Sequence, residues 1–76
     1  MITAKLYGLL RLNSGIKERQ LEAATVKEAL DLLCLEGIPR KELDGCVILV
    51  NGRNATKRTK LAPGDTVILM SPVAGG

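Results

Sequence analysis

The amino-terminal part of the chain has the pattern of two strands. Apolar and polar side chains alternate from Ile2 to Tyr7, and this period of two predicts a β-strand with one buried face. Gly8, a mixed stretch over residues 9–12 and the turn signal at 13–15 follow. We expect a weaker, exposed strand from about Ile16 to Leu21, because three charged residues in a row break the alternation there. The two strands would form a hairpin.

A helix is expected to begin at Thr25. Thr25-Val26-Lys27-Glu28 is a capping box, in which the Thr25 hydroxyl accepts from the Glu28 amide and Glu28 accepts from the Thr25 amide. The apolar residues that follow at helical spacing are Val26, Ala29, Leu30, Leu33 and Cys34. Gly37 and Pro39 would end the helix. Leu32 and Leu35 lie off the apolar stripe, so either the next segment covers them or they contact a partner.

Two apolar runs predict further strands. The run from Cys46 to Val50 ends at Asn51-Gly52, and its β-branched residues favour a strand buried on both faces, hence a central one. A short strand or turn is expected over 56–61. After a tight turn at 63–65, the run 66–70 predicts the last strand.

The order of these elements predicts an α+β fold. A hairpin, one main helix and further strands make a roll in which the helix packs on one face of a mixed sheet of four to five strands. Because the first and last strands both have a core pattern, we expect them to pair in parallel at the centre. This is the β-grasp (ubiquitin-like) arrangement. The domain would cover residues 1–70, and residues 71–76 would form a flexible C-terminal tail ending in Gly-Gly.

Composition excludes several function classes. The 76 residues contain no His, Trp or Phe, and Tyr7 is the single aromatic residue. Triad hydrolysis, His-ligated zinc and base-stacking platforms therefore have no candidates. Cys34 and Cys46 are too few for a metal site and are expected to be small buried residues without a disulfide. No apolar run reaches the ~20 residues of a membrane span, and no secretory signal is visible, so we expect a cytoplasmic protein.

The net charge of +3 is concentrated in the last third of the chain. The basic residues there are Arg53, Lys57, Arg58 and Lys60, against one acidic residue, Asp65. These charges have three interpretations: solvated loop charges, an electrostatic guide to an acidic partner face, or nucleic-acid binding. Nucleic-acid binding has thin support, because four charges stand without interleaved aromatic residues or a known motif.

The C-terminal tail carries the main functional signal. Because Gly75 and Gly76 have no side chains, the terminal carboxylate could pass through a narrow channel into the active site of another protein. Pro72 would stiffen the base of the tail, and Val73 could anchor in a groove. The alternative is a frayed chain end without a function.

Several segments together resemble the small subunit of molybdopterin synthase. They are Leu6-Tyr7-Gly8-Leu9-Leu10-Arg11, Thr25-Val26-Lys27-Glu28-Ala29-Leu30, Val50-Asn51-Gly52, 61–67 and the ending Pro72-Val73-Ala74-Gly75-Gly76. That family belongs, with the thiamine sulfur carrier, to the ubiquitin-like sulfur carriers, and the resemblance covers the whole chain. Family tails often have an aromatic residue and a second proline where this chain has Met70 and Ser71.

The resemblance implies that this chain supplies a reacting carboxylate and that its partners supply the chemistry. A ubiquitin-activating-type adenylyltransferase would use ATP and Mg to adenylylate Gly76, and a sulfur donor would convert it to a thiocarboxylate. A large synthase subunit would accept that sulfur for molybdopterin, the precursor of the molybdenum or tungsten cofactor. The chain would bind no cofactor itself. Alternatives are a carrier for thiamine thiazole or thiolated tRNA, a ubiquitin-like protein modifier, or a small binding domain with an accidental Gly-Gly.

Partner contacts are expected at the tail and near the turn after the first strand. The residues are Pro72, Val73 and Ala74 beside the reacting Gly75 and Gly76, together with Leu9, Leu10 and Arg11. Leu9, Leu10 and Leu12 are candidates for an exposed apolar patch, although one or two of them could instead fill the edge of the core. On the patch interpretation, Leu10→Asp weakens partner binding and leaves the fold intact.

Overall fold

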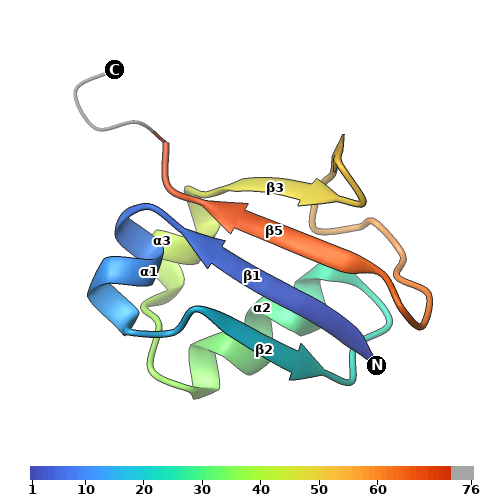
Figure 1. Cartoon of the computed structure of the whole chain (residues 1–76), viewed down its shortest axis with the longest axis horizontal. Coiled ribbons are helices and arrows are strands. Elements are labelled where there is room, and N and C mark those ends of the chain that lie inside the picture. Colours follow the sequence, from blue (N-terminus) through green and yellow to red (C-terminus); the bar gives the residue numbers. More distant parts are fainter. Residues whose placement is uncertain (73–76) are drawn as a thin grey trace.

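The computed structural model describes residues 1–72 of the chain as a five-stranded mixed sheet with three helices. The elements are β1 (Ile2–Tyr7), α1 (Leu9–Ser14), β2 (Glu18–Leu21), α2 (Val26–Leu35), α3 (Arg40–Asp44), β3 (Val47–Val50), β4 (Arg53–Asn54) and β5 (Thr66–Met70). The strand order is β2-β1-β5-β3-β4, and Figure 1 shows β2, β1, β5 and β3 side by side in that order. β1 and β5 run parallel at the centre and the other pairs are antiparallel. The predicted β-grasp arrangement and its central parallel pair are confirmed.

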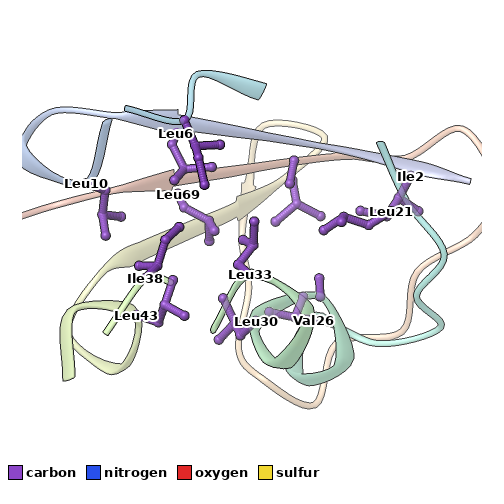
Figure 2. Packing of buried hydrophobic residues seen from close by; sticks show 14 residues of the cluster. Ile2, Leu6, Leu10, Leu21, Val26, Leu30, Leu33, Ile38, Leu43 and Leu69 are labelled. Carbon is purple, nitrogen blue, oxygen red and sulfur yellow. The ribbon is translucent and has the colours of Figure 1, made fainter. Parts of the chain in front are cut away.

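The core lies between one face of the sheet and the helices, with α2 as the longest of them (Figure 2). It is built from residues that alternate along the strands and recur every three or four positions along α2. The main contributors are Ile2, Ala4 and Leu6 of β1, Val67 and Leu69 of β5, and Val26, Ala29, Leu30 and Leu33 of α2. Since only this face is covered by the described helices, the intervening strand residues lie on an open face.

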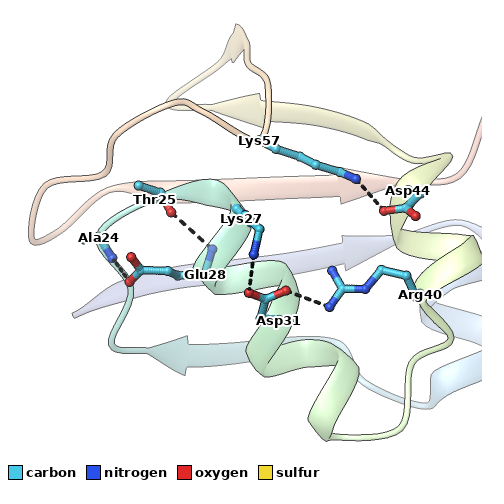
Figure 3. Close-up of polar contacts among 8 residues, drawn as sticks. All are labelled: Ala24, Thr25, Lys27, Glu28, Asp31, Arg40, Asp44 and Lys57. Atoms are coloured by element: carbon cyan, nitrogen blue, oxygen red, sulfur yellow. Dashed lines mark hydrogen bonds and ion pairs between the residues drawn. The ribbon is translucent and has the colours of Figure 1, made fainter.

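The predicted capping box forms with one change of partner. The Thr25 hydroxyl accepts from the Glu28 amide at 3.2 Å, as expected. The Glu28 carboxylate accepts from the Ala24 amide at 3.1 Å rather than from the Thr25 amide (Figure 3). The next amides of α2, those of Val26 and Lys27, donate to backbone carbonyls in the 57–59 segment at 3.0 Å. Carbonyl groups of the loop before β5, and not water molecules, therefore accept the hydrogen bonds of these first helix amides.

The strand formed within residues 46–50, β3, lies inside the sheet as predicted, but it is not buried on both faces. β3 lies between β5 and the two-residue β4, Val47 is 41% exposed, and the rest of β3 is half-buried. The reason is that the described helices cover one face of the sheet, so Ile48 and Val50 pack against the core while Val47 and Leu49 lie on the open face. The apolar run therefore forms a strand with one face against the core and the other face on the open side of the sheet.

Two short helices were not predicted as such. The mixed stretch at 9–12, assigned to the hairpin connection, forms α1 and is closed by Gly15 in the left-handed conformation (φ 73°). Residues after Pro39 form α3, which buries Leu43. The hairpin itself is confirmed by the β1–β2 register, in which Ile2 lies opposite Leu21.

The carboxyl end of α2 presents an apolar residue to solvent. Leu35 is 84% exposed and Leu32 is half-buried, so the segment after the helix does not cover Leu35. Cys34 is half-buried and packs against the core, as its place on the apolar stripe predicted. Both cysteines are free, and burial raises the pKa of the Cys46 thiol, which also donates to the Leu43 carbonyl at 3.0 Å.

None of the helices within residues 1–72 has the length and apolar character that a membrane crossing requires.

Candidate functional site

The base of the tail is held at the centre of the sheet. Met70, the last residue of β5, lies opposite Tyr7 of β1 and Val47 of β3. The chain therefore leaves the domain between two neighbouring strands, from a point whose backbone is paired on both sides. Predicted residues Val73, Ala74, Gly75 and Gly76 lie outside the described residues, and the structure places Ser71 and Pro72 before them.

Ser71 adds a second attachment beyond the sheet. Its hydroxyl accepts a hydrogen bond from the backbone amide of Leu10 at 2.9 Å. This amide lies in the first turn of α1, where the N-cap position is occupied by Gly8, which has no side chain to accept from it. Ser71 thus caps α1 from 61 positions along the chain. Gly8 has a φ of +65°, a conformation that side-chain-bearing residues rarely adopt.

An apolar patch surrounds this exit point on the open face of the sheet. We define the open-face patch as Tyr7, Val47, Leu49, Ile68 and Met70. These residues share one face because Tyr7 and Val47 both lie opposite Met70, and Leu49 lies opposite Ile68. Tyr7 and Val47 are each 41% exposed and the other three are half-buried. A contiguous apolar surface of this kind marks a protein contact site.

A groove lies on the other side of the tail base, between α1 and α3. Its volume is about 570 Å³, and its lining includes Leu9, Asn13, Lys41 and Pro72. Leu10 also lines it, and the groove brings together two exposed residues predicted to bind partners, Leu9 and Pro72. Leu9 is 47% exposed. The exit of the tail is thus flanked by two surfaces that a partner could contact.

The sequence matches the family described as the ThiS family over residues 4–76. The chain belongs to the ThiS family. The predicted membership among the ubiquitin-like sulfur carriers is confirmed. The match includes the tail through Gly76. A search of curated protein sequences gave no significant match.

Solved structures share the fold of this ThiS-family chain. SAMP1 from Haloferax volcanii superposes with a TM-score of 0.82 at 30% identity, covering 99% of this chain and 98% of the other. A Pyrococcus furiosus protein assigned as molybdopterin converting factor subunit 1 has a TM-score of 0.79 at 25% identity, with 95% and 97% covered. The complex of molybdopterin-converting factor subunits 1 and 2 from Helicobacter pylori gives 0.75 at 24% identity, with 99% and 97% covered, and shows the fold alone.

One predicted partner residue of this ThiS-family chain is in the core. Leu10 is 1% exposed, so the expectation of an exposed Leu10 is wrong. Once residues 9–14 form a helix, one side chain per turn faces the sheet, and Leu10 takes that place while Leu9, Arg11 and Leu12 remain exposed. The alternative interpretation, in which one of these leucines fills the edge of the core, holds.

The open-face patch was missed by sequence reasoning. The available signal was the pair of apolar runs at 47–50 and 66–70, interpreted as burial on two faces. In a two-layer fold with helices on one side, half of such a run faces outward. The alternate residues Leu49 and Ile68 could therefore have been assigned to an interaction surface once a single helical layer was assumed.

The charged residues of the later segments are partly used within the fold. Lys57 pairs with Asp44 at 2.6 Å, and Asp31 pairs with Arg40 at 2.6 Å and Lys27 at 3.0 Å (Figure 3). The hydrogen bonds from Arg40 and Lys27 lower the pKa of Asp31. These exposed pairs contribute little free energy each, but they connect α2 with α3, and α3 with the 57–59 segment.

The other predicted basic residues are Arg53, Arg58 and Lys60, and all three are exposed. An electrostatic role for them stays a prediction. Within residues 1–72, no group of three or more metal-ligating side chains could hold an ion.

Proposed function

We propose that this ThiS-family protein carries sulfur as a thiocarboxylate on Gly76 and delivers it to molybdopterin biosynthesis. The observation that carries the proposal is the family match through Gly76, joined to a tail whose base is fixed at the centre of an apolar face. A carrier of this kind needs a rigid docking surface and a narrow reacting end. The chain combines the two.

The chemistry assigned to Gly76 has two steps, both in partner active sites. A carboxylate oxygen of Gly76 attacks the α-phosphorus of ATP, bound with Mg by a ubiquitin-activating-type adenylyltransferase, and pyrophosphate leaves. Hydrosulfide from the sulfur donor then attacks the acyl carbon, AMP leaves with the C–O bond electrons, and loss of the S–H proton yields the thiocarboxylate. The residues of this chain position the carboxylate, while the large synthase subunit accepts the sulfur. No cofactor needs to be bound by the chain itself.

The choice of pathway rests on the comparison with the Pyrococcus furiosus protein assigned as molybdopterin converting factor subunit 1. A second candidate is a ubiquitin-like protein modifier, favoured by the 30% identity with SAMP1, which is described as small archaeal modifier protein 1. The two functions differ in the fate of Gly76. A carrier ends as a thiocarboxylate, whereas a modifier ends in an isopeptide bond to a lysine.

The test is the intact mass of the chain after incubation with ATP, Mg, the activating enzyme and a sulfur donor. We expect one oxygen to be replaced by sulfur. Oxidation of Met1 or Met70 adds nearly the same mass, so fragmentation must locate the change on Gly76. The chain lacking Gly76 is the control. An adenylate that never gains sulfur, together with lysine conjugates, would establish the modifier instead.

The pathway is tested separately. The thiocarboxylated protein and the large subunit should convert the pterin precursor to molybdopterin, while the chain lacking Gly75 and Gly76 should not. Conversion by the truncated chain would refute the carrier role. Thiocarboxylate formation without pterin conversion would direct the search to thiamine thiazole or tRNA thiolation.

A further inference from the structure

Three cations lie together beside the open-face patch. We define the cationic rim as Lys5 of β1, Arg11 of α1 and Lys17, the residue before β2. The three line one small pocket of about 150 Å³ together with Tyr7 and Glu18. Tyr7 belongs to both the pocket and the patch, so the two surfaces are continuous.

The backbone holds these residues in place from three segments. The Leu6 amide donates to the Lys17 carbonyl at 3.0 Å, which fixes Lys17 beside the end of β1. Lys5 lies opposite Glu18 on one side and Ile68 of the patch on the other. Arg11 is carried by α1, whose first turn is tied to the tail base through Ser71. The rim is therefore positioned relative to the tail exit.

The charges of the rim are not used inside the described part of the chain. None of its three members forms an ion pair with a described residue, whereas Arg19, Lys27, Arg40 and Lys57 do. Arg11 and Lys17 are exposed and Lys5 is half-buried. Glu18 is the single carboxylate lining the pocket, so the three cations of the rim leave the site with a net positive charge.

We propose that the cationic rim binds carboxylate side chains of a protein partner whose apolar contact surface covers the open-face patch. The identity of that partner as the enzyme that adenylylates Gly76 rests on the proposed function. The positive charge of the rim favours a partner whose contact surface has an acidic border. The open-face patch favours a partner whose contact surface has an apolar centre. This combination is the usual anatomy of a protein contact: an apolar core with a polar rim.

The geometry favours a protein over a nucleic acid. The pocket is below the ~300 Å³ of typical small-ligand pockets, so it suits a carboxylate side chain better than a nucleotide. A stacking platform is also missing, because Tyr7 is the only aromatic residue in the sequence.

The first experiment uses peptide probes and is independent of the proposed function. The ¹⁵N-labelled protein is titrated with an amphipathic peptide of Leu and Glu, with its Leu and Lys counterpart, and with a single-stranded RNA, at physiological salt. We expect the acidic peptide alone to shift the amide signals of Lys5, Arg11, Lys17 and the patch. Equal shifts with both peptides, no shift with the acidic one, or RNA binding at the rim would overturn the proposal.

The second experiment measures association with the adenylyltransferase that modifies Gly76. Arg11→Glu/Lys17→Glu is compared with Arg58→Glu/Lys60→Glu, which makes the same charge change in the segment beside the amino end of α2. We expect the association rate of the rim variant to fall about tenfold or more at low salt and to approach wild type at high salt. The Arg58→Glu/Lys60→Glu control should keep an association rate close to that of the wild type.

The outcomes distinguish a failure of the rim proposal from a failure of the proposed carrier function. An equal loss in both variants would mean that net charge alone guides association and would overturn the rim. No loss in either variant would also overturn it. If wild-type Gly76 is never adenylylated, the proposed function fails, and the peptide titration still decides the rim. Circular dichroism of both variants checks the fold, which exposed substitutions should leave intact.

Discussion

The hydroxyl oxygen of Ser71 lies 2.9 Å from the backbone nitrogen of Leu10 and accepts its hydrogen bond. This contact joins the first residue after β5 to the first turn of α1. It places a polar anchor where the sulfur-carrier family often has a second proline. In place of a proline ring, the hydrogen bond between Ser71 and Leu10 restrains the backbone at this position, and Pro72 follows it.

The first prediction concerns this cap. Ser71→Ala should lower the free energy of unfolding by about 1 kcal/mol, because an amide in the first turn of α1 loses its acceptor. Urea unfolding measures the loss, and hydrogen exchange of the Leu10 amide should accelerate. Ser71→Thr keeps the hydroxyl and serves as the control. Unchanged exchange in the alanine variant would show that water replaces the cap without cost.

The second prediction separates two adjacent leucines. Leu10→Asp should unfold the domain, because it places a carboxylate in an apolar core and removes about 2–5 kcal/mol of packing. A chain of this size has a total stability of roughly 5–10 kcal/mol. Leu9→Asp should keep the fold, since Leu9 is exposed, and should weaken partner binding. Thermal unfolding followed by circular dichroism distinguishes them, and a folded Leu10→Asp variant would contradict the buried assignment.

The third prediction tests the open-face patch. Ile68→Asp should reduce affinity for the activating enzyme at least tenfold, because a charge would be buried unpaired at the contact. Leu35→Asp makes the same kind of change on the exposed end of α2 and should leave affinity unchanged. Calorimetry of both variants, with a melting curve for each, provides the measurement. A larger loss of affinity for Leu35→Asp than for Ile68→Asp would instead place the partner-binding surface on α2.

The fourth prediction is a pH dependence of stability. The Ala62 amide at 2.8 Å and the Asn51 side chain at 3.0 Å donate to Asp65 and lower its pKa. Because the folded pKa lies below the unfolded value of about 3.9, this carboxylate stabilises the fold above about pH 4. That stabilisation is lost as the pH falls through the folded pKa.

Asp65→Asn tests this assignment. The difference in urea midpoint between wild type and variant should be largest near neutral pH and should shrink below about pH 4. Asp31→Asn is a useful comparison, since the pKa of Asp31 is lowered first by hydrogen bonds from Arg40 and Lys27 and then by their charges, and added salt would screen the charge contribution. A midpoint difference independent of pH would assign the effect to the turn geometry and not to the charge.

Local sequence was sufficient for most elements and for their order. The alternation at 2–7 reports which strand face is buried, and the capping box at Thr25 satisfies helix amides within four residues. Each pattern needs only neighbours along the chain, so each could be identified without the fold. The parallel pairing of the first and last strands also followed, because two core strands must share the centre of a small sheet.

Tertiary structure alone decided the surfaces that make up the candidate site. An apolar run does not reveal how many layers cover it, so the outward face of Leu49 and Ile68 became clear only when helices occupied one side. Leu10 entered the core because α1 formed, and α1 takes its cap from Ser71, 61 positions away. The chain by itself determined its β-grasp order and its Gly-Gly ending. Long-range contacts, which no local pattern encodes, decided where Ser71 and Pro72, at the base of the tail, leave the sheet and which surfaces flank them.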